Sequence, residues 1–166
     1  MQRHAILIPR SREHHRSLRL ARDLQRAELD AAYGQRQIRA AADDLRRHFS
    51  EEEKTFAVWV TELPDSHTVL SLLDRMHREH RSLIAIIDVL CADAPDFEPG
   101  AGSLSRRLAY HTFGQLLAEH IAFEERSLFP ALQDCCLMAV SEMPAGVRPG
   151  VRPGVRPGVR PGVRHS

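Results

Sequence analysis

The residues with the clearest chemical potential are histidines and glutamates that interrupt apolar helical stripes. The chain has ten histidines and only three cysteines in 166 residues, so imidazole is its prominent metal-binding group. His48 and Glu52 are four residues apart, as are His120 and Glu124. This spacing places the two side chains of each pair one turn apart on one helix face. Both pairs occupy positions where an apolar stripe would otherwise continue.

Two more segments supply an inward histidine. His80 lies within an apolar stripe, and His14 and His15 both lie near the face of Leu18, where periodicity alone leaves the choice between them open. Burying so many polar groups is costly unless each is paired. A metal centre would satisfy all of them at once. Because one tetrahedral zinc ion takes four ligands, six side chains predict two ions with the carboxylates placed to bridge them.

The elements that must position these side chains are helices. Turn signals of the hairpin type are absent from the sequence, while apolar residues recur at helical spacing. Ser11 is the expected N-cap of the first helix, Gly34 its terminator, and Pro64 the end of the second. Pro130 is expected to kink the fourth helix or to end its regular part. The expected helices span residues 11–32, 35–63, 65 or 66 to 91, and 103–136.

Four such helices with short connections predict an all-α fold, an antiparallel up-down four-helix bundle over residues 1–140. Residues 141–166 are expected to form a disordered low-complexity tail, because a VRPG unit with Pro and Gly in every repeat suits neither helix nor packed strand.

Charge and composition narrow the function classes. Five of the 23 basic residues lie in the VRPG repeats from residue 147 onward. The chain before them is therefore acidic, with 22 Asp and Glu, and a nucleic-acid partner is disfavoured. No apolar run is long enough to span a membrane, the apolar stretch at the N-terminus is short for a signal peptide, and three cysteines form no disulfide framework. A cytoplasmic protein is the expectation.

The order of the motifs repeats along the chain. His15-Arg-Ser-Leu18 returns as His80-Arg-Ser-Leu83, and each is followed by a helix with the HxxxE pattern. Together with the segments REHHRSL, HFSEEE and HIAFEERSLFPAL, this pattern resembles the hemerythrin-like domain, also called the HHE cation-binding domain, over residues of about 10 to 135.

The resemblance implies a non-heme di-iron centre bridged by two carboxylates and an oxo or hydroxo group. By position it assigns the metal ligands, and the repeated HRSL favours His15 over the alternative His14. His77, one turn before His80, is a possible additional ligand. Spacing alone would equally suit manganese or zinc. The implied ligand set is His15, His48, Glu52, His80, His120 and Glu124.

Two function classes follow from the resemblance. The favoured one is a metal-binding protein that binds or senses O2 or NO, or handles iron; the alternative is a di-iron enzyme with oxidase, peroxide or NO chemistry at the same site. Oxygen-carrying hemerythrins have HxxxH on the third helix and HxxxxD on the fourth, whereas this chain has HxxH (His77, His80) and HxxxE. Six ligands instead of seven leave more room for a small ligand. Tyr110 and His111 are candidates for orienting a ligand histidine, or equally a surface pair.

Overall fold

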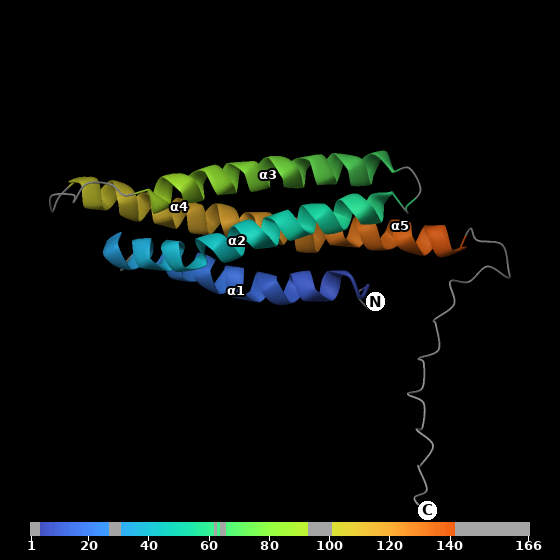
Figure 1. Cartoon of the computed structure of the whole chain (residues 1–166), viewed down its shortest axis with the longest axis horizontal. Helices are drawn as coiled ribbons and strands as arrows, with labels where there is room; N and C mark the ends of the chain where they lie inside the picture. The colour runs from blue at the N-terminus through green and yellow to red at the C-terminus, as the bar shows by residue number, and fades with distance from the viewer. Residues whose placement is uncertain (1–3, 27–30, 62, 64–65, 93–100, 142–166) are drawn as a thin grey trace, which may run out of the picture.

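The computed structural model describes residues 4–26, 31–61, 63, 66–92 and 101–141. Within them the elements are helical: α1 (Leu7–Gln25), α2 (Ala31–Val60), α3 (His67–Cys91), α4 (Ala101–Phe123), the π-helical turn η1 (Glu124–Leu128) and α5 (Phe129–Ser141). Consecutive helices run in opposite directions, and α5 continues the line of α4 (Figure 1). The predicted up-down four-helix bundle is confirmed. The expected tail lies outside the described residues.

The first helix differs from its expected bounds at both ends. It begins at Leu7, without a side-chain cap, and not at Ser11. Pro9 lies inside its first turn, where a missing backbone N–H removes no helical hydrogen bond. It ends at Gln25, well before residue 32. The third helix follows the prediction more closely: Ser66 caps it by accepting a hydrogen bond from the Val69 backbone N–H at 3.3 Å, and it ends at Cys91.

Gly34 does not terminate a helix, as the sequence suggested, but lies in the first turns of α2. A Cβ atom at this position would lie 2.5 Å from Cδ2 of Tyr110. Gly114 allows a second close approach, because a Cβ there would lie 2.6 Å from the backbone oxygen of Ala21. The two glycines therefore mark places where the helices pack too closely for any side chain.

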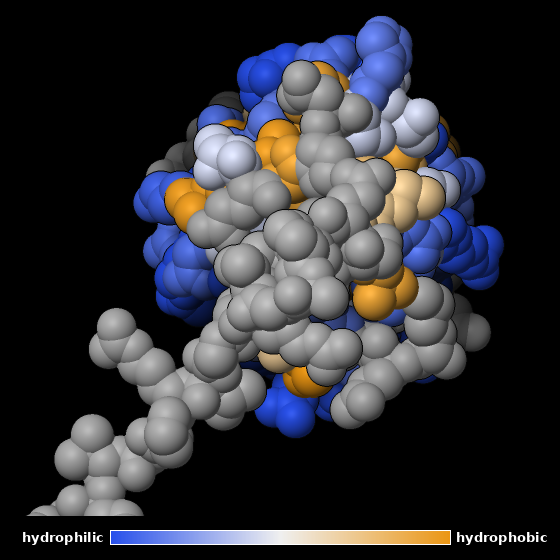
Figure 2. All heavy atoms as spheres, turned by 90° about the vertical axis from the view of Figure 1, so that its right-hand side faces the viewer, coloured by the Kyte–Doolittle hydropathy of each residue, from blue (hydrophilic) through white to orange (hydrophobic). Residues whose placement is uncertain are grey.

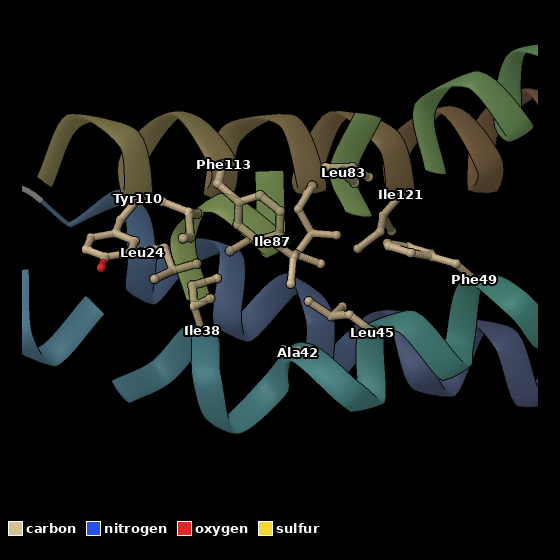
Figure 3. Close-up of a cluster of buried hydrophobic side chains, with 13 residues drawn as sticks. Leu24, Ile38, Ala42, Leu45, Phe49, Leu83, Ile87, Tyr110, Phe113 and Ile121 are labelled. Carbon is tan, nitrogen blue, oxygen red and sulfur yellow. The ribbon is translucent and has the colours of Figure 1, made fainter. Parts of the chain in front are cut away.

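The apolar core consists of two clusters. One is built from the second half of α1, the first half of α2, the second half of α3 and most of α4 (Figure 3). It holds Leu24, Ile38, Leu45, Ile87, Tyr110, Phe113 and Leu117 among others. The other occupies the opposite end of the bundle and contains Leu7, Phe56, Trp59, Val69, Leu73, Met76, Leu128, Phe129 and Leu132. The layer that separates the two clusters is polar.

Two positions show how narrow the buried faces of the helices are. Leu108 of α4 is 63% exposed, and Ala42 is buried whereas the adjacent Ala41 of α2 is half-buried. Figure 2 shows the end of the bundle at which α3 begins. Hydrophilic side chains lie around its periphery, and the hydrophobic side chains form separate patches. No helix in the described part of the chain is both long and apolar enough to cross a bilayer.

Candidate metal centre

Six polar side chains meet in the layer between the two apolar clusters. Each is at most 6% exposed: His14, His48, Glu52, His80, His120 and Glu124. The first comes from α1, the next two from α2, the fourth from α3, and the last two from α4 and η1. Every helix of the bundle thus contributes an imidazole to one buried layer.

These side chains form two groups that share both carboxylates. His14 and His48 form the first group with Glu52 and Glu124, and His80 and His120 form the second with the same two glutamates. Within each group, one potential ligand atom per residue lies within 4.8 Å of the others. This arrangement offers two neighbouring cation positions that share both carboxylates.

The ring nitrogens that face the centre are Nε2 in all four histidines. His14 Nε2 lies 3.1 Å from Glu124 Oε2, and His120 Nε2 lies 3.3 Å from Glu124 Oε1. On the other side, His48 Nε2 lies 3.4 Å from Glu52 Oε2. His80 Nε2 lies between the two carboxylates, 3.7 Å from Glu52 and 3.6 Å from Glu124. The lone pairs of imidazole and carboxylate therefore converge.

The outer nitrogens, Nδ1, each face a further glutamate. His14 Nδ1 donates to Glu125 at 2.8 Å and His48 Nδ1 to Glu13 at 2.9 Å. In the other half of the layer, His80 Nδ1 donates to Glu53 at 3.0 Å and His120 Nδ1 to Glu79 at 2.8 Å. Because a carboxylate can only accept, these contacts place a proton on Nδ1 and leave Nε2 for the centre.

The centre is not satisfied by the protein alone. Among the described residues, both carboxylate oxygens of Glu52 and Glu124 and Nε2 of His14 are buried and make no hydrogen bond of good geometry, although His14 Nε2 lies within ion-pair distance of both glutamates. Buried polar atoms without partners are rare and costly in native proteins, and an ion is one of the standard explanations. The chemistry of this donor set, imidazole nitrogen and carboxylate oxygen, fits iron, manganese or zinc.

Protons balance part of this charge in the protein without metal. Burial opposes a charge on His14, but the carboxylates of Glu124, Glu125 and Glu52 outweigh it and raise its pKa to about 11. Burial likewise opposes a charge on His120, yet Glu124 and Glu79 raise its pKa to about 9. Protonated His120 then donates from Nε2 to His80 Nε2, 3.1 Å away.

Among the remaining groups of the layer, the pKa values of His48 and Glu124 are lowered and that of Glu52 is raised. Burial lowers the pKa of His48 to about 4, with Glu13 opposing, so its ring is neutral at pH 7. Burial and the neighbouring Glu124 raise the pKa of Glu52 to about 8. For Glu124, burial favours the neutral form, but the surrounding His120, His14 and His80 hold its pKa well below the usual value. The opposite shifts favour the negative charge on Glu124 over Glu52.

One sequence expectation about this layer needs correction. His14, offered as the alternative, lies in the layer, whereas the favoured His15 is exposed on the outer side of α1. The choice of His15 came from matching HRSL with HRSL. The buried positions show a different register: His14, Ala21 and Leu24 correspond to His80, Ile87 and Leu90 at the same spacing.

Three other candidates do not join the two groups. His77 is half-buried and belongs to neither. Tyr110 is buried in the apolar cluster against Gly34, and His111 is exposed. The residues that do contact the imidazoles from outside, Glu13, Glu53, Glu79 and Glu125, were not predicted. Their signal was present, since Glu precedes His14 and His80 directly and follows Glu52 and Glu124 directly.

Aromatic rings enclose the layer from both ends. Phe49 stacks on His80 with ring centroids 4.4 Å apart, and Phe129 stacks on His14 at 5.4 Å. Phe49 also meets His120 edge-on at 5.7 Å. These apolar walls exclude water, lower the local dielectric and restrict the rotation of the rings.

A π-helical turn begins at Glu124. The Phe129 backbone N–H donates to the Glu124 carbonyl, so that the turn contains one residue more than an α-helical turn. Pro130, which has no backbone N–H, lies two residues after this turn. The break in regular α-helix that was expected at Pro130 is therefore found just before it, as the wider π-helical turn. The extra residue lets Glu124 face the layer while Phe129 and Leu132 still reach the apolar cluster.

Two surface grooves reach the outer side of the layer. One, about 110 Å³, lies between α1 and α2 and is lined by His48 and Glu13 together with Asp44 and Glu51. The other, about 270 Å³, lies between α3 and α4 and is lined by His120 and Glu79. Both grooves are too small for a bulky substrate to reach the buried oxygens, but they would admit a hydrated ion or a diatomic molecule.

A comparison with known protein families agrees with this geometry. The family model described as hemerythrin HHE cation binding domain matches residues 10–132, which includes the whole polar layer. No curated protein and no solved structure matches the chain.

Proposed function

Since the chain belongs to the hemerythrin HHE cation-binding family, we propose that it holds two non-heme iron ions in the polar layer and uses them to bind or sense O2 or NO, or to handle iron. The observation that carries this proposal is the pair of buried glutamates, Glu52 and Glu124, whose oxygens have no hydrogen-bond partner and belong to both His/Glu groups.

The number of ions follows from this sharing. Each group offers two imidazoles and the same two carboxylates, and a carboxylate with two oxygens bridges two cations readily. A single ion would occupy one group and leave the two imidazoles of the other group without an ion to bind. In our proposal the ligands are His14, His48, Glu52, His80, His120 and Glu124, with the glutamates as bridges.

The donor set together with the family favours iron and a small ligand. Nitrogen and carboxylate donors suit iron as well as manganese or zinc, and the family resemblance selects iron. Four protein donors per ion are fewer than the six that iron commonly takes, so each ion would keep open positions. The stacked rings of Phe49 and Phe129 keep bulk water away from those positions.

We favour a binding protein over an enzyme because the six polar side chains of the layer are buried and the two surface grooves beside them are small. These grooves suit ions and diatomic molecules. The three free cysteines fit the reducing cytoplasm that we propose as its location. The di-iron enzyme with oxidase, peroxide or NO chemistry is the competing proposal.

The test is metal content per chain after anaerobic loading with Fe(II), compared with Mn(II) and Zn(II). We expect two irons per chain and a new visible absorption band on exposure to air or NO. A band that persists and reverses on removal of the gas would favour binding, and continuous gas consumption would favour the enzyme. One ion or none per chain would refute the shared-carboxylate proposal.

A further inference from the structure

We propose that Glu13, Glu53, Glu79 and Glu125 are positioning residues that form a closed ring around the metal centre, each holding one imidazole so that its Nε2 points inward. This inference rests on the proposed metal function. It adds four residues, none of them a proposed ligand, whose task is to orient the ligands.

The geometry of the four contacts is uniform. Every Nδ1–oxygen distance lies between 2.8 and 3.0 Å. Every glutamate is partly exposed, between 24% and 39%, while every imidazole is almost fully buried. Four independent contacts of the same length and the same burial pattern indicate one repeated structural device, since chance surface pairs vary in geometry.

The contacts connect the helices in a cycle. Glu13 of α1 holds a histidine of α2, Glu53 of α2 one of α3, and Glu79 of α3 one of α4. Glu125 of η1 closes the cycle by holding His14 of α1. Each neighbouring pair of helices is therefore joined at the height of the centre, and the ring fixes both imidazole orientation and helix spacing.

The ring also supplies charge. Two divalent ions would carry four positive charges, and Glu52 and Glu124 offset only two of them. Hydrogen bonds from Nδ1–H to carboxylates make imidazoles more basic and so better ligands. Two of the outer carboxylates are themselves fixed by arginines: Arg10 donates to Glu13 at 2.9 Å, and Arg75 to Glu79 at 2.7 Å.

The first experiment measures metal affinity in four single variants, Glu13→Gln, Glu53→Gln, Glu79→Gln and Glu125→Gln. Fe(II), loaded anaerobically, and Zn(II) are titrated in competition with a chromophoric chelator. Glutamine keeps the size and removes the charge, and we expect a 10- to 100-fold loss of affinity in each variant. Circular dichroism verifies that each variant is folded.

A neighbouring glutamate provides a matched control. Glu119 directly precedes His120 and accepts a hydrogen bond from Gln115. Its carboxylate contacts no imidazole of the layer in the described contacts. We therefore expect Glu119→Gln to bind metal within about twofold of the wild-type protein.

The second experiment needs no variant. Long-range ¹H–¹⁵N correlation spectra of the metal-free wild-type protein at pH 7 report which nitrogen of a neutral imidazole carries the proton. We expect the Nδ1–H tautomer for His48, which faces Glu13. An Nε2–H tautomer would overturn the positioning role, because Nε2 would then be unable to accept a metal without rearrangement.

The outcomes separate the two proposals. A wild-type protein that binds no metal would overturn the proposed function together with this inference. A wild-type protein that binds two ions, with ring variants indistinguishable from the Glu119→Gln control, would overturn the ring alone. Both the proposed function and the ring are supported if metal affinity falls only in the four ring variants and His48 is the Nδ1–H tautomer.

Discussion

The substitution Gly114→Ala tests how closely α1 and α4 must approach to build the centre. The new Cβ would lie 2.6 Å from the backbone oxygen of Ala21 and 3.1 Å from Cβ of Leu24. Real Cβ atoms essentially never come within 3.0 Å of such an atom. A backbone oxygen cannot swing aside as a side chain can, so α1 has to move away by several tenths of an ångström.

The expected magnitude is the balance of two effects. Replacing a helical glycine by alanine stabilises a helix by about 1 kcal/mol, whereas overpacking a core costs about 1–3 kcal/mol. We expect a net loss of up to about 2 kcal/mol in the free energy of unfolding. His14 lies two turns before Ala21 on the same face of α1, so its 3.1 Å contact with Glu124 lengthens. Metal affinity should then fall by about tenfold.

Urea unfolding of the metal-free protein and chelator-competition titration measure the two effects. Gly34→Ala is the matched control, because its Cβ would meet the ring of Tyr110 within the apolar cluster. That variant should lose stability but keep its metal affinity. A Gly114→Ala protein more stable than the wild type, as helix propensity alone predicts, would refute the argument.

Three further predictions concern the same layer. His14→Ala should lower the metal content or weaken metal affinity, while His15→Ala should leave both unchanged because His15 is exposed; metal analysis of the two purified variants decides between them. Metal affinity should rise between pH 6 and pH 8, roughly tenfold per pH unit for each proton displaced. The sign follows from the raised pKa values of His14 (about 11) and His120 (about 9): both rings hold protons in this range, and a metal ion has to remove them. Titrations at several pH values measure this, and a flat profile would contradict it. Removal of metal by a chelator should lower the melting temperature, because two ions at a free concentration a hundredfold above their dissociation constants stabilise the fold by about 5 kcal/mol. Calorimetry with and without the chelator tests this, and equal melting temperatures would speak against coupling of metal binding to folding.

The sequence predicted the bundle and most of its polar layer because both depend on one periodicity. The spacing of His48 with Glu52 and of His120 with Glu124 is a property of one helix, and burial on one face follows from it. The ends of the first helix were harder to predict. Pro9 and Gly34 act as helix breakers only in helix interiors, and here Pro9 occupies a first turn while Gly34 adjoins Tyr110.

The choice between His14 and His15 depended on information from a neighbouring helix. Both are near the face of Leu18, but only His14 meets Glu52, Glu124 and Glu125, which come from α2 and η1. Cross-helix contacts of this kind have no signature in local spacing. A comparison of Glu13-His14 with Glu79-His80, in place of the HRSL segments, would have given the correct register.

The polar layer between the two apolar clusters has a consequence for cooperativity. Each cluster protects the backbone amides of its own end of the bundle, and the layer between them contributes little apolar contact. In the metal-free protein the two ends should therefore open as separate units in hydrogen exchange, with different protection. Ions held jointly by all four helices would join these units, so that the whole bundle would exchange through one common opening. Metal occupancy would then determine how many folding units the chain has.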